Sequence, residues 1–289
     1  MNNITSVQYV NQPNNIQTTA ITMPVFPGLQ YYEFSQNPLQ ELALSEKARI
    51  RQEPELLEML SGCETENRYH VFIILPNGME KYLFKCKEES TFCQRNCCPS
   101  ELREFNMKIK SIPSQMEYND NFQTYFATLV KPFKCTCCCL ARPIITGVFH
   151  DNNQQFGHIL EECTCCDPKF VVSNNLGIRY FITIEYCQCG FCCRNGCSKF
   201  HEVEAQIRIG DGNGEVVGKI IKKVAQDILE VLGDADTYDI YFPKDASPEE
   251  KLTLIMATLF IDYRYYETQA SSKKNKRSGR RRRSRRRRR

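Results

Sequence analysis

The chain has 289 residues, of which 42% are apolar and 25% charged. This size and composition predict one large or two modest globular domains and exclude a chain that is disordered throughout. No cationic segment followed by an apolar run opens the sequence, so we expect no secretory signal and a cytosolic origin. The 17 cysteines are therefore not expected to pair as disulfides, which belong mainly to small secreted domains.

The net charge of +4 hides an asymmetry, because residues 273–289 hold 13 of the 38 basic residues and no acidic one. Residues 1–272 keep 25 basic and 34 acidic residues, a net charge of −9. We predict that 271–289 is a disordered arm attracted to nucleic acid, anionic lipid or an import receptor. Its candidate binding residues include Lys273, Lys274, Arg280, Arg281, Arg282 and Arg283.

The N-terminal part of the chain changes character twice. Residues 1–22 are rich in Asn, Gln and Thr and are predicted to be disordered. Apolar residues then recur at roughly helical spacing over 39–60, which predicts one or two short helices. Pro54 either ends the first helix or begins a second one.

From residue 67 onward the apolar period falls from 3.6 to 2, which is typical of strands. Residues 68–85 read as a hairpin around Pro76-Asn77-Gly78. Similar units occupy 143–162, 169–185 and 202–223, and single strands are predicted at 104–111 and 122–130. A series of hairpins indicates an antiparallel sheet, and ten or more strands normally form a sandwich or a barrel. Spacing alone leaves that choice open.

The C-terminal segment predicts a helix of a different kind. Ser247-Pro248-Glu249-Glu250 is a favourable helix start, and 252–261 is apolar on nearly every face until Asp262. Spanning a bilayer takes about 20 apolar residues, so this stretch is too short for a membrane anchor. A helix that is apolar all round then needs protein on every side. We expect it to thread the sheet, with Asp262 and Arg264 near an end that water or a partner reaches.

Clustered cysteines form three CxxC pairs, Cys135/Cys138, Cys163/Cys166 and Cys189/Cys192. Pairs at this spacing can hold zinc as thiolates. Free cysteines also serve as small buried apolar residues. A third interpretation is acylation of an exposed loop, since two or more acyl chains hold a protein firmly on a membrane. The residues Cys135, Cys137, Cys138 and Cys139 are the candidates for acylation.

An acidic segment near the C-terminus has oxygen ligands at positions 1, 3 and 12 of a calcium-loop frame, namely Asp234, Asp236 and Asp245. Position 6 has Asp239 where the frame needs Gly, and position 12 has Asp where Glu is usual. The pattern therefore predicts at most a weak calcium site. Enzyme signatures are not found: the glycines of 210–214 lie between two alternating runs and predict a hairpin turn rather than a phosphate-binding loop.

From about Met23 to Glu267 the sequence resembles the phospholipid scramblase family. The resemblance lies in several motifs that follow one another in the family's order: MPVFPGLQYY (23–32), ELLEMLSGCETENRY (55–69), FCQRNCCPS (92–100), KPFKCTCCC (131–139), DPKFVV (167–172), VVGKI (216–220), GDADTYDIYFPKD (233–245) and KLTLIMATLFIDYRYYE (251–267). The cysteine cluster lacks the family's proline and the two cysteines after it, and the arginine tail differs from the family's usual ending.

The resemblance implies a closed twelve-stranded antiparallel tubby-like barrel over 23–270, around a buried helix at about 248–266. It also implies acylation at Cys135–Cys139, and calcium-responsive movement of phospholipids between leaflets, with Asp234, Asp236 and Asp245 in the calcium segment. Such a protein does no covalent chemistry and sits on the cytoplasmic face of the plasma membrane, and the basic tail adds the nucleus as a destination.

A barrel whose bore is filled cannot by itself open a path of about 30 Å through lipid, so oligomerisation or bilayer thinning would have to help. Two alternatives to a scramblase remain open. One is a lipid-anchored adaptor that binds lipids or proteins without moving lipids. The other is a zinc-bearing nucleic-acid binder whose arginine tail contacts phosphate.

Overall fold

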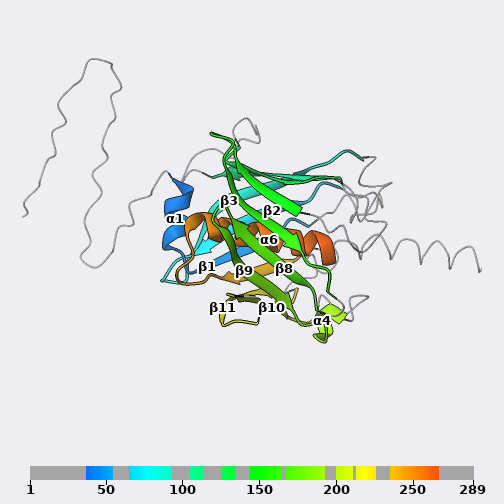
Figure 1. Cartoon of the computed structure of the whole chain (residues 1–289). Helices are drawn as coiled ribbons and strands as arrows, with labels where there is room; N and C mark the ends of the chain where they lie inside the picture. The colour runs from blue at the N-terminus through cyan, green and yellow to red at the C-terminus, as the bar shows by residue number, and fades with distance from the viewer. Residues whose placement is uncertain are drawn as a thin grey trace, which may run out of the picture. The chain divides into compact units, whose positions relative to one another are not determined.

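The computed structural model describes residues 37–54, 65–92, 104–112, 125–133, 144–164, 167–192, 200–210, 213–225 and 235–266. Within these ranges the chain forms twelve strands and three helices (Figure 1). The helices are α1 (Pro38–Leu44), α4 (Cys189–Cys192) and α6 (Pro248–Tyr265). The strands are β1 (Lys47–Gln52), β2 (Arg68–Ile74), β3 (Glu80–Glu89), β4 (Phe105–Ser111), β5 (Ala127–Lys131), β6 (Ile144–Phe149), β7 (Gln155–Glu161), β8 (Lys169–Asn174), β9 (Gly177–Ile184), β10 (Val203–Arg208), β11 (Val216–Lys222) and β12 (Thr237–Tyr241).

The strands form a closed barrel in which each strand pairs antiparallel with its neighbours in sequence. Closure comes from β1, which pairs with β2 on one side and with β12 on the other. The barrel predicted from the family resemblance is confirmed, and the choice between sandwich and barrel is resolved. Closure also removes the exposed strand edges that an open sheet of this size would present.

Helix α6 runs through the barrel, as Figure 1 shows. Ser247 begins it with a reciprocal capping box, in which its hydroxyl accepts from the Glu250 amide and its own amide donates to the Glu250 carboxylate. Every residue of 252–261 is at most 3% exposed. At Gly157 of β7 the helix comes so close that a Cβ atom would collide with Thr253. The expected buried helix is thus confirmed, and the strands supply its apolar surroundings.

The N-terminal helix prediction is correct for α1 and wrong for the residues after it. Residues 47–52 form strand β1 instead of continuing a helix. Ala48 and Ile50 point into the core and are fully buried, whereas Lys47, Arg49 and Arg51 alternate on the outer face. Lys47 and Arg49 pair with Asp239 of the adjacent strand β12, and Arg51 pairs with Glu80 of β3, so the strand is held by contacts that the local apolar spacing does not show. Residues 55–60 lie outside the described part.

Antiparallel pairing gives the barrel two distinct ends. At the start end, where α6 begins, lie α1 and the turns β2–β3, β6–β7, β8–β9 and β10–β11. At the exit end, where α6 ends, lie the connections β1–β2, β3–β4, β5–β6, β7–β8, β9–β10 and β11–β12. Figure 1 places α1 on the side of the start end and α4 on the side of the exit end.

Candidate functional site

Near the exit end, α6 carries a carboxylate inside the barrel. Asp262 is 2% exposed, and it accepts hydrogen bonds from the hydroxyls of Tyr69 and Tyr238, each at 2.6 Å. The expectation that water reaches Asp262 is therefore wrong. The reason is that β2 and β12 extend past this turn of the helix and place two tyrosines on the carboxylate.

The surroundings of Asp262 change its acidity. Burial and the nearby negative charge of Asp236 raise its pKa, while the bonds from Tyr238 and Tyr69 and the charge of Lys222 act in the opposite direction. The net effect places the pKa of Asp262 at about 7. Asp236 is itself ion-paired with Lys222, whose side chain is 2% exposed. The exit end therefore contains a buried group of charges around the last turns of α6.

A second polar link joins the end of α6 to the barrel wall. Glu161 at the end of β7 is 3% exposed and accepts from Arg264 Nε at 3.0 Å and from the Tyr265 hydroxyl at 2.8 Å. Arg264 was expected to face water or a partner, and its side chain is instead 18% exposed and paired with Glu161. This pairing holds the last turn of the helix against β7.

The start end has a matching anchor that sequence reasoning missed. Glu250 accepts from Arg179 Nε at 2.6 Å, from the Tyr180 hydroxyl at 3.1 Å and from Asn174 Nδ2 at 3.0 Å. Its side chain is 5% exposed. The capping-box pattern predicted a role for Glu250 within its own helix, but nothing local signals that three residues of the β8–β9 hairpin converge on it.

Lys251 links the start of α6 to the end of α1. Its ammonium donates to the carbonyl oxygens of Leu42, Ala43 and Ser45 at 3.2, 2.7 and 2.8 Å. The side chain therefore supplies a cation to the C-terminal carbonyls of α1, which favour positive charge. Burial lowers the pKa of Lys251. Helix α6 is thus fixed by polar contacts at both ends as well as by its apolar middle.

The structure does not bring the predicted calcium ligands together. Asp236 lies at the exit end of β12, and Asp245 is exposed at the start end. The extended chain from 236 to 242 alone spans about 20 Å at roughly 3.3 Å per residue, too far for both carboxylates to bind one ion. Asp234 lies outside the described residues. The described part of 234–245 therefore does not fit a single calcium loop.

Asp239, in the middle of β12, also has another role. Its carboxylate binds Arg49 through Nε at 2.6 Å and Nη2 at 2.9 Å, and Lys47 at 2.9 Å. Burial would raise its pKa, but the bonds from the two cations outweigh burial and lower the pKa of Asp239. These contacts hold β12 against β1, where the barrel closes.

The cysteines are distributed unevenly between the barrel ends. Apart from Cys86 within β3, every cysteine of the sequence falls in a connection at the exit end or in α4. Cys163, Cys187, Cys189 and Cys192 are described and exposed, whereas Cys86 is fully buried, which raises the pKa of its thiol to about 12. The acylation candidates Cys135, Cys137, Cys138 and Cys139 lie outside the described residues, in the connection that follows β5 at the exit end.

The described part of the chain ends at the exit end, before the basic tail. Helix α6 ends at Tyr265 and the description ends at Tyr266, so the tail residues Lys273, Lys274 and Arg280–Arg283 lie outside it. No helix in the described ranges is long and apolar enough to cross a membrane. In those same ranges, no three His, Cys, Asp or Glu side chains gather in a way that could hold a metal ion.

Comparisons with known proteins identify a family and several relatives whose sequences match most of this chain. The model of the family described as Scramblase matches residues 29–268, a range that contains all twelve strands and α6. Phospholipid scramblase 1 of Homo sapiens is 28% identical over 250 residues, covering 86% of this chain and 68% of the relative. Phospholipid scramblase 2 of Bos taurus is 28% identical, with 83% of this chain and 72% of the relative covered.

A relative of lower identity covers a similar share of this chain. Phospholipid scramblase family member 5 of Homo sapiens is 25% identical over 249 residues, covering 85% of this chain and 79% of the relative. Coverage of the mouse phospholipid scramblase 1 is 66%, so the chain spans about two thirds of the length of several relatives. Because the family model matches well over half of the sequence, from before β1 to beyond α6, the chain belongs to the scramblase family.

Proposed function

We propose that this chain is a phospholipid scramblase, which moves phospholipids between the two leaflets of a bilayer without covalent chemistry. The observation that carries the proposal is the family match over 29–268, which includes the whole barrel and its central helix. The relatives that share this region are named phospholipid scramblases. The substrate would be the phospholipid of the membrane on which the protein sits.

The filled barrel restricts how lipid could move. Because α6 is enclosed by strands and 252–261 is at most 3% exposed, the bore offers no passage for a headgroup. Lipid would instead cross beside the protein, where docking thins or disorders the bilayer and lowers the barrier of the roughly 30 Å hydrocarbon layer. Oligomerisation would increase such a disturbance.

Two further features belong to the proposal. Acyl groups on Cys135, Cys137, Cys138 and Cys139 would tether the barrel to the cytoplasmic face of the plasma membrane, since a single acyl chain gives only marginal binding. Calcium would act by reducing repulsion between anionic lipid and acidic side chains at the exit end, among which Asp167, Glu185 and Glu202 are exposed. This role requires no loop that encloses the ion.

Reconstitution tests the proposal directly. Purified full-length protein, in its acylated form, is placed in liposomes that carry a fluorescent phospholipid in both leaflets, and dithionite then destroys the accessible label. We expect dithionite to reach label from the inner leaflet in protein-containing vesicles, faster with calcium than with a chelator. Cleaving thioesters with hydroxylamine before reconstitution is expected to slow lipid movement by weakening the tether.

The opposite outcomes separate the alternatives. Protein that binds the vesicles but leaves the inner-leaflet label protected contradicts scrambling and favours the adaptor. Tightly held zinc in the purified protein, with binding to nucleic acid that weakens steeply as salt rises and no lipid movement, favours the zinc-bearing nucleic-acid binder.

A further inference from the structure

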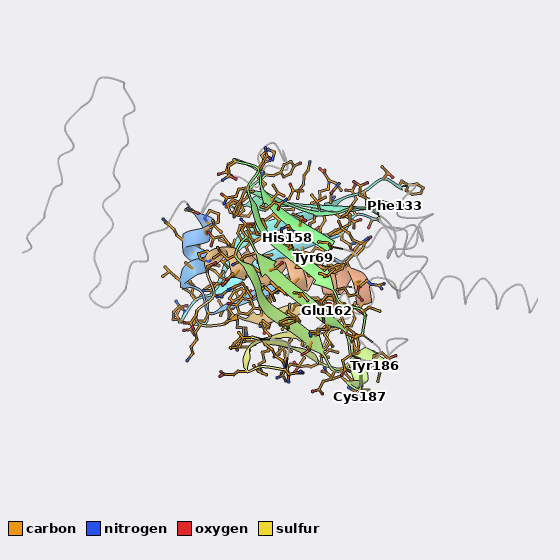
Figure 2. The ribbon with its side chains drawn as sticks, viewed as in Figure 1. Tyr69, Phe133, His158, Glu162, Tyr186 and Cys187 are labelled. Atoms are coloured by element: carbon orange, nitrogen blue, oxygen red, sulfur yellow. The ribbon has the colours of Figure 1, made fainter. Side chains whose placement is uncertain are left out.

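Exposed aromatic side chains of the described residues gather at one end of the barrel. Phe92, Phe133, Tyr186 and Phe200 are 60, 59, 44 and 59% exposed, and all four lie in exit-end connections. Figure 2 shows Phe133 and Tyr186 on the side where α6 ends. The large exposed apolar residues at the start end are aliphatic, such as Leu44 and Leu176 at 82 and 94% exposure. Tyr favours the interfacial layer of a bilayer, and Phe is common on protein faces that enter the boundary between headgroups and acyl chains, so the exit end has the composition of a membrane-facing surface.

The β9–β10 connection is held firmly on the end of the helix. Phe191 of α4 is fully buried, with its ring centroid 5.3 Å from that of Tyr265 and 5.7 Å from that of Tyr186. The Tyr186 amide also donates to Asp167 Oδ1 at 2.7 Å, which ties this connection to the β7–β8 connection. The anchored connection therefore presents Tyr186 outward from a fixed position.

The cationic tail has its origin at the same end. Six residues, 267–272, separate Tyr266 from Lys273, and these seven residue steps reach at most about 25 Å when extended. The 13 basic residues of 273–289 are therefore attached within about 25 Å of the last described residue of the exit end. The exposed acids Asp167, Glu185 and Glu202 would repel an anionic surface, and the 13 cations of the tail would offset that repulsion.

We propose that the exit end is the docking face for a bilayer rich in anionic phospholipid. The barrel stands on the membrane with the axis of α6 directed toward it, Phe133, Tyr186 and Phe200 enter the interfacial layer, and the tail binds headgroups. This orientation rests on the proposed function, because it specifies how the same protein meets its lipid substrate. It also places the acylation candidates of the β5–β6 connection on the membrane side.

The absence of tryptophan from the sequence provides a clean test. Full-length single-tryptophan variants are made at two exit-end sites, Phe133→Trp and Phe200→Trp, and at two start-end sites, Met79→Trp and Leu176→Trp. Each is mixed with phosphatidylcholine/phosphatidylserine vesicles whose acyl chains carry bromine. We expect the bromolipid to quench the two exit-end tryptophans and to leave the two start-end tryptophans unaffected. Equal quenching at both ends, or quenching at the start end alone, overturns the proposal.

A binding measurement with matched pairs extends the test. The double variant Phe133→Ser/Phe200→Ser is expected to bind the vesicles about tenfold more weakly or worse, a change that corresponds to roughly 1.4 kcal/mol. The control Leu44→Ser/Leu176→Ser removes two apolar side chains of the start end that are even more exposed than Phe133 and Phe200, and it is expected to change binding less than twofold. Losses of the same size in both variants contradict the proposal.

Removal of residues 273–289 tests whether the basic tail provides the electrostatic attraction to anionic vesicles. Binding of the intact chain to phosphatidylserine-containing vesicles should weaken as salt increases, and the shortened chain should lose most of that dependence. Tail-dependent binding to RNA without any binding to vesicles would overturn the docking proposal. Lipid scrambling without exit-end quenching contradicts the orientation alone, and exit-end quenching without scrambling contradicts the proposed function alone.

Discussion

Replacement of Phe260 by alanine is expected to lower the free energy of unfolding by about 3–5 kcal/mol, as large-to-small changes at buried aromatic sites do. Phe260 is fully buried in the C-terminal half of α6, and its ring meets that of Phe170 in β8 edge-on, with 5.8 Å between centroids. The substitution leaves a cavity at the contact between helix and wall, which neighbours enclosed by a barrel cannot easily fill. Urea unfolding followed by circular dichroism measures the change.

The matched control is Leu176→Ala, which removes a similar apolar side chain that is 94% exposed in the β8–β9 turn. We expect that change to stay within about 0.5 kcal/mol, the usual range for surface substitutions. If the Phe260 variant lost no more stability than this control, α6 would not be the core of the barrel.

Stability is also expected to fall as pH rises from about 4 to about 7 because of Asp262. Its pKa is about 7 in the folded chain and about 4 in an unfolded one. Between these values the folded state holds a proton that the unfolded state has released, so raising the pH favours unfolding. The contribution amounts to up to about 4 kcal/mol, fully present below pH 4 and lost by pH 7.

Asp262→Asn provides the comparison, since an amide keeps the shape and can still bond to Tyr69 and Tyr238 but cannot ionise. Its unfolding free energy should show a shallower decline between pH 4.5 and 7.5 than that of the unmodified chain. Asp151→Asn, at an exposed carboxylate in the β6–β7 turn, should keep the original decline. The same pH profile for the Asp262 variant and the unmodified chain would show that Asp262 stays ionised throughout.

Strand positions could be read from the sequence where the pattern is local. The alternation in β4 and β5, the β10–β11 turn at Gly210 with φ of +81° and the capped start of α6 all follow from periods and caps that a few residues carry. Strand β1 could not be read in this way. Its outward cations derive their partners from Asp239 and Glu80, which are distant in sequence.

The buried charges show a similar division. In β5 the inward-facing positions are Ala127, Leu129 and Lys131. A lysine that falls on the inward face of an alternating strand is predicted by that alternation to be buried. Lys131 is indeed fully buried. The sequence around Asp262 does not predict its burial. A charged residue that ends an apolar run is equally consistent with a buried carboxylate and with the point where the helix reaches water. Only the tyrosines of β2 and β12, which pairing brings over the helix, decide its position.

The candidate site was predictable in part for the same reason. Cysteine clusters and the arginine tail are evident in the sequence, but only the order of twelve antiparallel strands shows that the described strand and helix ends next to them share one end of the barrel. At 234–245 the local spacing instead predicted a calcium loop that the strand arrangement does not support. The alternating Tyr238, Ile240 and Phe242 belong to a strand that separates Asp236 from Asp245.

Hydrogen exchange of the full-length chain, free and bound to phosphatidylserine-containing vesicles, tests most directly whether α6 stays inside the barrel at the membrane. We expect the amides of α6 and of β7 and β8, two strands that contact it, to remain protected in both states, with added protection confined to exit-end connections. Faster exchange in β7 and β8 on vesicle binding would mean that the helix has left the barrel for the lipid. That result would contradict a scramblase that docks with its core intact.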